Sequence, residues 1–218
     1  MSCRTRPLLA VVFLLFCLLI SATAFAHPHV WVELRVRPLL NEQGQLTGLQ
    51  QAWRFDPFYS LILIEELQRG GPSSELEKRY DELASEVVAN LQRFDFFSRL
   101  HSEGRRLPVG QVQHYNLMRI GQRVEFSFVL PLQHPVSLNE ARVSYQVYDP
   151  SYFIEILHIP EQGVDTQSLD AACRVRLEAP NPSSEQIEKA MALDVDDISD
   201  DPQLGQYFAE RVVLDCRP

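Results

Sequence analysis

The chain has 218 residues, of which 45% are hydrophobic and 22% are charged, and this composition excludes collagen-like, coiled-coil and wholly disordered proteins. Its formal net charge of −9 and pI near 5.1 argue against a nucleic-acid-binding protein, so we expect no nucleic-acid partner. Beyond the N-terminal segment, no apolar run is long enough to span a membrane, and we expect no stable membrane insertion once that segment is removed.

Residues 1–26 have the organisation of a secretory signal peptide. Arg4 and Arg6 form a positive region, Leu8 to Ile20 are apolar without interruption, and Ala24-Phe25-Ala26 has the small-residue pattern of a cleavage site. We predict cleavage after Ala26, a mature chain that starts at His27, and a periplasmic location. An uncleaved membrane anchor is the alternative, but the apolar run is short for a membrane span. A lipoprotein is disfavoured because the only nearby cysteine lies inside the apolar run.

The start of the mature chain predicts a β-hairpin. Apolar residues alternate from Val30 to Val36, which is the period of a strand with one buried face. Residues 41–44 form a turn signal, and the alternation then continues to Phe55.

Two helices are predicted next. Asp56-Pro57 is typical of an N-cap followed by the first helical residue, and this helix should end near Arg69. Ser74 and Glu77 have the spacing of a capping box. Apolar residues then recur at helical spacing, so a long amphipathic helix is expected to about Leu100.

Strand patterns return after Pro108, and Gly121-Gln122 is expected to be a tight turn between two strands. Ser183 and Gln186 predict the cap of a short helix that ends near Leu193. The strand candidates are 109–119, 122–130, 141–149, 152–159, 172–178 and 210–216. We therefore predict an α+β fold in one domain, 27–218, with a mainly antiparallel, sandwich-like body and a helical insertion at 57–100.

The number and positions of the cysteines are consistent with export. Cys3 and Cys17 leave with the signal peptide, so Cys173 and Cys216 remain as a pair in an oxidising compartment. Each has the parity of the apolar residues in its strand-like run, which directs both sulfurs to the apolar face. We predict a Cys173–Cys216 disulfide worth ~3–4 kcal/mol on the loop-entropy estimate.

The strongest candidate for chemistry is the mature N-terminus, His27-Pro28-His29. Its α-amine and the His27 imidazole can chelate one divalent ion, and His29 would lie on the same side of a strand about 7 Å away. Pro28 has no N–H, which disfavours a site built on a deprotonated backbone amide. Amine and imidazole ligands suit Zn, Ni, Co or Cu without choosing between them. The alternative is an exposed terminus whose histidines bind nothing.

Further ligands would have to come from elsewhere in the chain. Asp56, His114, Asp149 and His158 are candidates to complete a site, but the sequence does not select among them. Both aspartates precede a proline, so a capping or turn role is the simpler interpretation for each.

The remaining polar signals favour structural roles. His101 is interpreted as a cap at a helix C-terminus, and His134-Pro135 as a loop. The acidic run at 194–201 lacks the glycine and glutamate that an EF-hand loop requires, so a solvated loop is expected. No G-x-S-x-G, H-E-x-x-H or P-loop motif occurs, and we expect a protein that is not an enzyme.

Four ordered motifs resemble the family of domain of unknown function number 1007, across nearly the whole mature chain. They are His27-Pro28-His29-Val30-Trp31-Val32, Trp53-Arg54-Phe55-Asp56-Pro57-Phe58-Tyr59-Ser60, Val147-Tyr148-Asp149-Pro150-Ser151-Tyr152-Phe153 and Leu204-Gly205-Gln206-Tyr207-Phe208-Ala209. The resemblance implies the periplasmic component of an uncharacterised ABC-type transport system, linked to divalent metals and to nickel/cobalt-type membrane transporters. Two-lobed solute receptors contain repeated βαβ units, which this sequence lacks, so an accessory or chaperone is the preferred interpretation.

Three hypotheses follow for function. The first is a periplasmic metal-binding accessory of a nickel, cobalt or zinc transport system, with a membrane metal transporter as partner. The second is an enzyme that holds copper between its N-terminal histidine and a second, distant histidine. The third is a non-catalytic interaction module that binds a membrane transporter without metal.

Overall fold

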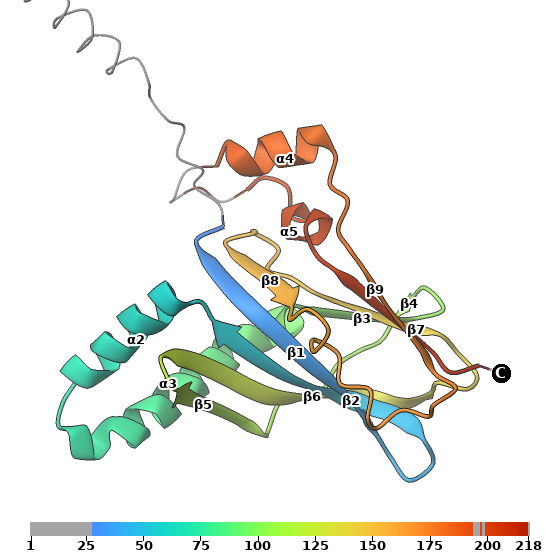
Figure 1. Cartoon of the computed structure of the whole chain (residues 1–218), viewed down its shortest axis with the longest axis horizontal. Coiled ribbons are helices and arrows are strands. Elements are labelled where there is room, and N and C mark those ends of the chain that lie inside the picture. Colours follow the sequence, from blue (N-terminus) through green and yellow to red (C-terminus); the bar gives the residue numbers. More distant parts are fainter. Residues whose placement is uncertain (1–27, 194–196, 198, 218) are drawn as a thin grey trace, which may run out of the picture.

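The computed structural model describes residues 28–193, 197 and 199–217, and within this part of the chain two five-stranded sheets pack into a sandwich (Figure 1). In sheet A the strands lie in the order β5 (Tyr115–Ile120), β6 (Arg123–Ser137), β2 (Gln45–Phe55), β1 (Val30–Leu40) and β8 (Ile154–His158). In sheet B the order is β4 (Arg105–Arg106), β3 (Ser98–Ser102), β7 (Val143–Val147), β10 (Arg211–Asp215) and β9 (Arg174–Glu178). None of the helices in the described residues is long and apolar enough to cross a membrane.

The strands form because their apolar residues alternate, and the inward faces of the two sheets make the core. Trp53 of β2 packs against Phe126 and Phe128 of β6 and against Phe97. A polar chain also crosses this core, since the Trp53 indole N–H donates to Gln51 Oε1 at 2.9 Å and Gln51 Nε2 donates to Ser98 Oγ at 2.9 Å. The buried side chains of Gln51, Trp53 and Ser98 therefore have the hydrogen-bond partners that burial demands.

The predicted α+β class is confirmed, and the antiparallel hairpin of β1 and β2 is present as expected. One pair departs from the antiparallel rule: β1 and β8 run parallel, with Val30 opposite Ile154. Helix α2 (Pro57–Arg69) begins at the predicted residue, and α4 (Ser184–Met191) has the predicted capping box of Ser183 and Gln186.

The predicted end of the second helix is wrong. Helix α3 (Leu76–Leu91) is followed by the 3-10 segment η2 (Gln92–Phe97), and the chain then becomes strand β3. The chain reverses at Asp95, Phe96 and Phe97, whose φ angles are 52°, 51° and 54°. This reversal buries Phe96 against Phe128 of sheet A and allows β3 to pair with β7. Core packing therefore overrides the helical pattern of this segment.

Three further interpretations of polar residues are corrected. The Ser74–Glu77 capping box is absent, because the 3-10 turn η1 (Ser73–Glu75) precedes α3 and no side chain caps that helix. His101 is a residue of β3 rather than a helix cap, and His134 lies in β6 rather than in a loop. In both cases pairing with a distant strand decides the conformation.

The predicted disulfide is confirmed. Cys173 and Cys216 are bonded, and their Cα atoms are 4.0 Å apart. Cys173 precedes β9 and Cys216 follows β10, so the bond joins the ends of two paired strands at the margin of sheet B.

Candidate functional site

The four motifs meet at one end of the sandwich. We call this region the motif end and define it by residues 29–32, 55–60, 149–153 and 204–209. There the His29 N–H donates to the Phe153 carbonyl at 2.9 Å, and the Gly205 N–H donates to the Pro150 carbonyl at 3.2 Å. In Figure 1 the start of β1, coloured blue, and the short helix α5 (Leu204–Tyr207), coloured orange-red, lie at the same end of the fold. Both are hydrogen-bonded to residues 149–153, so segments almost 180 residues apart are joined through the third motif.

Asp56 connects three elements of the motif end. Its Oδ1 accepts the backbone N–H groups of Phe58 and Tyr59, both at 2.9 Å, which caps helix α2 as predicted. Its Oδ2 accepts the N–H of Trp31 in β1 at 3.2 Å. The carboxylate therefore fixes the end of β2, the start of α2 and the start of β1 together.

Asp149, which follows β7 of sheet B, has a similar role at the start of β8 in sheet A. Its Oδ1 accepts the N–H of Ser151 at 3.0 Å, and its Oδ2 accepts the N–H of Ile154, the first residue of β8, at 3.1 Å. Because β8 is the neighbour of β1, the two aspartates hold the starts of adjacent strands. The Asp56-Pro57 and Asp149-Pro150 dipeptides thus occupy two similar structural positions.

Aromatic side chains are exposed around these aspartates. Trp31, Phe58 and Phe153 are 49%, 73% and 40% exposed. The His29 ring packs against the Phe153 ring, with 4.9 Å between ring centroids. We call these four residues the aromatic cluster. Exposed aromatic side chains gathered near one end are typical of a binding surface.

The proposed metal ligands are distributed unevenly over the structure. His27 lies outside the described residues, so its pairing with His29 stays a prediction. Asp56 and Asp149 hold backbone N–H groups, as described above, and His114 lies in the exposed segment before β5. In the described part of the chain, no three His, Cys, Asp or Glu side chains are grouped so that they could hold a metal ion.

His158 belongs to a buried hydrogen-bonded triad that joins the two sheets. It is 6% exposed, its Nδ1 is 2.8 Å from Glu210 Oε2, and its Nε2 is 3.1 Å from the Tyr145 hydroxyl. With a neutral imidazole, Nδ1–H donates to the Glu210 carboxylate and Nε2 accepts from Tyr145. Burial raises the pKa of Tyr145, and the Glu210 charge adds to this effect, so the phenol stays protonated as a donor.

Sequence reasoning identified His158 but not its partners. The alternation of β7 places Tyr145 inward, but only the packing of sheet B on sheet A brings it to His158. Glu210, just before β10, gave no sequence signal.

The triad leads to a stability prediction. Tyr145→Phe should lower the free energy of unfolding by about 1–2 kcal/mol, because the buried His158 Nε2 would lose its donor. Urea unfolding followed by fluorescence measures this change. Tyr148→Phe is the matched control, since no hydrogen bond of the Tyr148 hydroxyl occurs within the described residues. Equal stability of the two variants would contradict the role of the triad.

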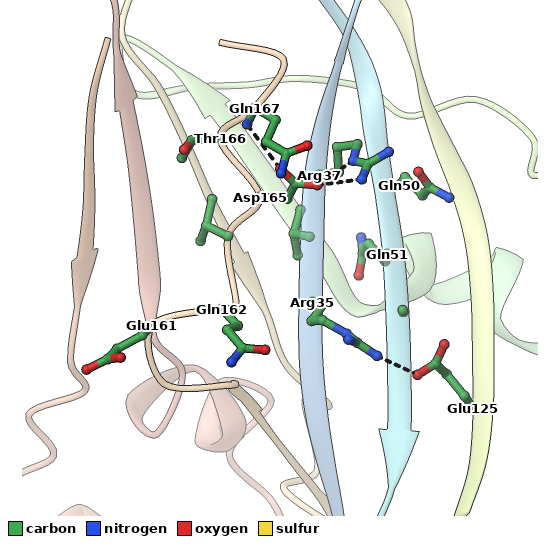
Figure 2. Close-up of a pocket in the computed structure, with 13 residues that line it drawn as sticks. Arg35, Arg37, Gln50, Gln51, Glu125, Glu161, Gln162, Asp165, Thr166 and Gln167 are labelled. Atoms are coloured by element: carbon green, nitrogen blue, oxygen red, sulfur yellow. Dashed lines mark hydrogen bonds and ion pairs between the residues drawn. The ribbon is translucent and has the colours of Figure 1, made fainter. Parts of the chain in front are cut away.

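A hollow on the outer face of sheet A is lined by none of the residues of the motif end. It has a volume of about 530 Å³ and lies between β1, β2 and residues 161–167 (Figure 2). Both arginines of β1 in this hollow are paired, since Arg35 bonds Glu125 at 2.9 Å and Arg37 bonds Asp165 at 2.6 Å. The two β1 arginines that line the hollow are therefore already engaged by carboxylates of the protein.

The fold and the motif end define a two-sheet α+β protein with one end built from four motifs. Residues 12–216 match the family described as "Protein of unknown function (DUF1007)", and the chain belongs to this family. An uncharacterised protein of Haemophilus influenzae is 27% identical over 205 residues, which are 93% of this chain and 97% of that relative.

Proposed function

We propose that this protein is a periplasmic, non-catalytic accessory of a membrane transport system for nickel, cobalt or zinc, and that it binds one divalent ion (Zn, Ni, Co or Cu) through His27 and His29. The observation that carries the proposal is the position of His29. It immediately precedes strand β1 at the motif end, where its backbone N–H donates to the Phe153 carbonyl and the Phe153 ring packs on its imidazole. A ligand on a rigid element loses little conformational freedom when it binds a metal.

The chemistry of the terminus supports the same proposal. After cleavage at Ala26, His27 offers an amine and an imidazole from one residue, and His29 follows two residues later. The Cys173–Cys216 disulfide is consistent with an oxidising compartment. Asp56 and Asp149 keep the roles described above, so we propose them as supports of the motif end.

The aromatic cluster favours the second candidate function, an interaction module. Trp31, Phe58 and Phe153 provide exposed apolar area of the kind that anchors protein interfaces. In the accessory hypothesis this surface would contact the membrane transporter. In the alternative hypothesis it would do so without any metal.

Metal titration of the mature protein, with its N-terminus verified by intact mass, tests the proposal. We expect one divalent ion per chain when NiCl₂, CoCl₂, ZnCl₂ and CuCl₂ are each titrated by calorimetry. His27→Ala should weaken binding at least about tenfold, because it removes the imidazole of the chelate and even outer-shell changes cost 10–100-fold. His29→Ala should have a smaller effect. One additional alanine before His27 should also weaken binding, although both imidazoles remain.

His134→Ala is the matched control, because this histidine is exposed on β6 and far from the N-terminus in sequence. It should bind metal like the unaltered protein. If neither His27→Ala nor His29→Ala changes the affinity, the metal proposal fails and the interaction module replaces it. Copper-dependent oxidation of a reductant by the loaded protein would instead support the enzyme hypothesis.

A further inference from the structure

The outer face of sheet B carries arginines whose guanidinium groups have no ion-pair or hydrogen-bond partner among the described residues. The strand register places Arg176, Val213, Ser144 and His101 in one row across β9, β10, β7 and β3. Arg211 lies one row away, opposite Gln146, and Arg142 immediately precedes β7. Residues from four strands therefore lie next to one another in one region of this face.

These residues enclose a hollow of about 450 Å³, which we call the arginine basin. Its defining residues are His101, Arg142, Ser144, Gln146, Arg176 and Arg211. A second hollow of about 290 Å³ continues from it, because Arg142 and Arg176 line both and Arg174 is added. The floor is polar and well packed: Gln146 is only 8% exposed and accepts hydrogen bonds from Arg211 and Gln206.

Many strand arginines are paired with carboxylates, including Arg99 and Arg106 of sheet B, which both pair with Asp95. On sheet A, Arg35 is paired with Glu125, Arg37 with Asp165, and both Arg54 and Arg123 with Glu33. On sheet B, the guanidinium groups of Arg142, Arg174 and Arg176 form no ion pair or hydrogen bond within the described part of the chain. The chain as a whole has a net charge of −9, so a shortage of carboxylates does not explain the difference.

The carboxylates near the basin do not neutralise it. Asp215 is bonded to Arg217 at 2.8 Å, and this pairing lowers the pKa of Asp215. Glu103 accepts the Arg142 backbone N–H at 2.8 Å and pairs with Arg217 at 3.3 Å. Glu178 remains at the rim, at the end of β9. Asp215 and Glu103 are therefore engaged by other groups, while the guanidinium groups of Arg142 and Arg176 have no such partner among the described residues.

The lowered pKa of His101 reflects the same positive environment. Partial burial lowers its pKa, and the charges of Arg106, Arg211 and Arg99 lower it further. The imidazole is therefore neutral at neutral pH, and it offers a hydrogen-bonding group beside fixed positive charges.

We propose that the arginine basin binds a small, multiply charged oxyanion, carrying phosphate or carboxylate groups. Guanidinium forks match the two oxygens of such groups, and arginines on two sides suit a ligand with more than one of them. The neutral donors and acceptors of Ser144, Gln146 and His101 suit hydroxyl or carbonyl groups on the same ligand. The inference does not depend on metal binding at the N-terminus, because it involves the opposite sheet and other residues.

Calorimetric titration of the full mature protein with inorganic phosphate and with citrate, at low ionic strength, tests the proposal. The double variant Arg142→Gln and Arg176→Gln should bind at least about tenfold more weakly, because charge-assisted hydrogen bonds are lost. Both side chains are exposed and have no ion-pair partner in the part of the chain that the structure describes, so the fold should persist, and thermal melting checks this. If the double variant does not fold, Arg176→Gln alone replaces it.

Arg69→Gln is the matched control, since it removes the same charge from the exposed end of α2. It should bind phosphate and citrate like the unaltered protein. Flotation with vesicles of phosphatidylglycerol, compared with phosphatidylcholine, distinguishes a lipid headgroup from a free solute. Binding of either kind that the double variant loses supports the site. Absence of binding to all of these probes, or equal binding by the double variant, overturns it.

Discussion

Replacing Gly205 by alanine should lower the free energy of unfolding by at least about 3 kcal/mol, because the motif end has no space for a methyl group. A Cβ atom at this position would lie 1.8 Å from the Asp149 carbonyl oxygen and 2.9 Å from its carbonyl carbon. Both are backbone atoms, so no side-chain rotation can relieve the contact. The Gly205 N–H also donates to Pro150, and this hydrogen bond would be lost as α5 moves away.

Thermal melting should show a decrease of about 6–12 °C in Tm, since 1 kcal/mol corresponds to ~2–4 °C in a protein of this size. Gly70→Ala is the matched control. The nearest atom to its added Cβ would be Arg79 Cδ at 3.2 Å, in a flexible side chain that can move. A Gly205→Ala protein as stable as Gly70→Ala would show that α5 is not packed against residues 149–152.

Removing the Cys173–Cys216 bond should have an effect of similar size. The bond closes a loop with a sequence separation of 43, for which the loop-entropy estimate gives about 4 kcal/mol of stabilisation at 25 °C. The double variant Cys173→Ala and Cys216→Ala should therefore melt roughly 10 °C lower than the unaltered protein. Alanine is chosen because Cys216 is buried and tolerates no added polar group.

A reducing agent provides the control for this second experiment. It should lower the Tm of the unaltered protein toward that of the double variant, and it should leave the double variant unchanged. A reductant effect on both proteins, or on neither, would be incompatible with a stabilising disulfide.

Local patterns in the sequence determined much of this fold. Alternation predicted the β1–β2 hairpin, and Asp56-Pro57 predicted the start of α2, because capping involves only neighbouring backbone groups. The Cys173–Cys216 pair also followed from the sequence, since parity and an even cysteine count left one pairing in the mature chain. The metal-binding hypothesis for His27 and His29 likewise rests on local chemistry.

Tertiary structure decided the features that join distant segments. Helix α3 ends early because Phe96 reaches the core by reversing the chain, and helical spacing carries no information about that. Likewise, the partners of His158 and the grouping of Arg142, Arg176 and Arg211 depend on the order of strands in two sheets. The local sequence around each of these residues contains no pattern that indicates its distant partners. Only the pairing of strands that are far apart in the chain, driven by burial of their apolar faces, brings their charges and polar atoms together.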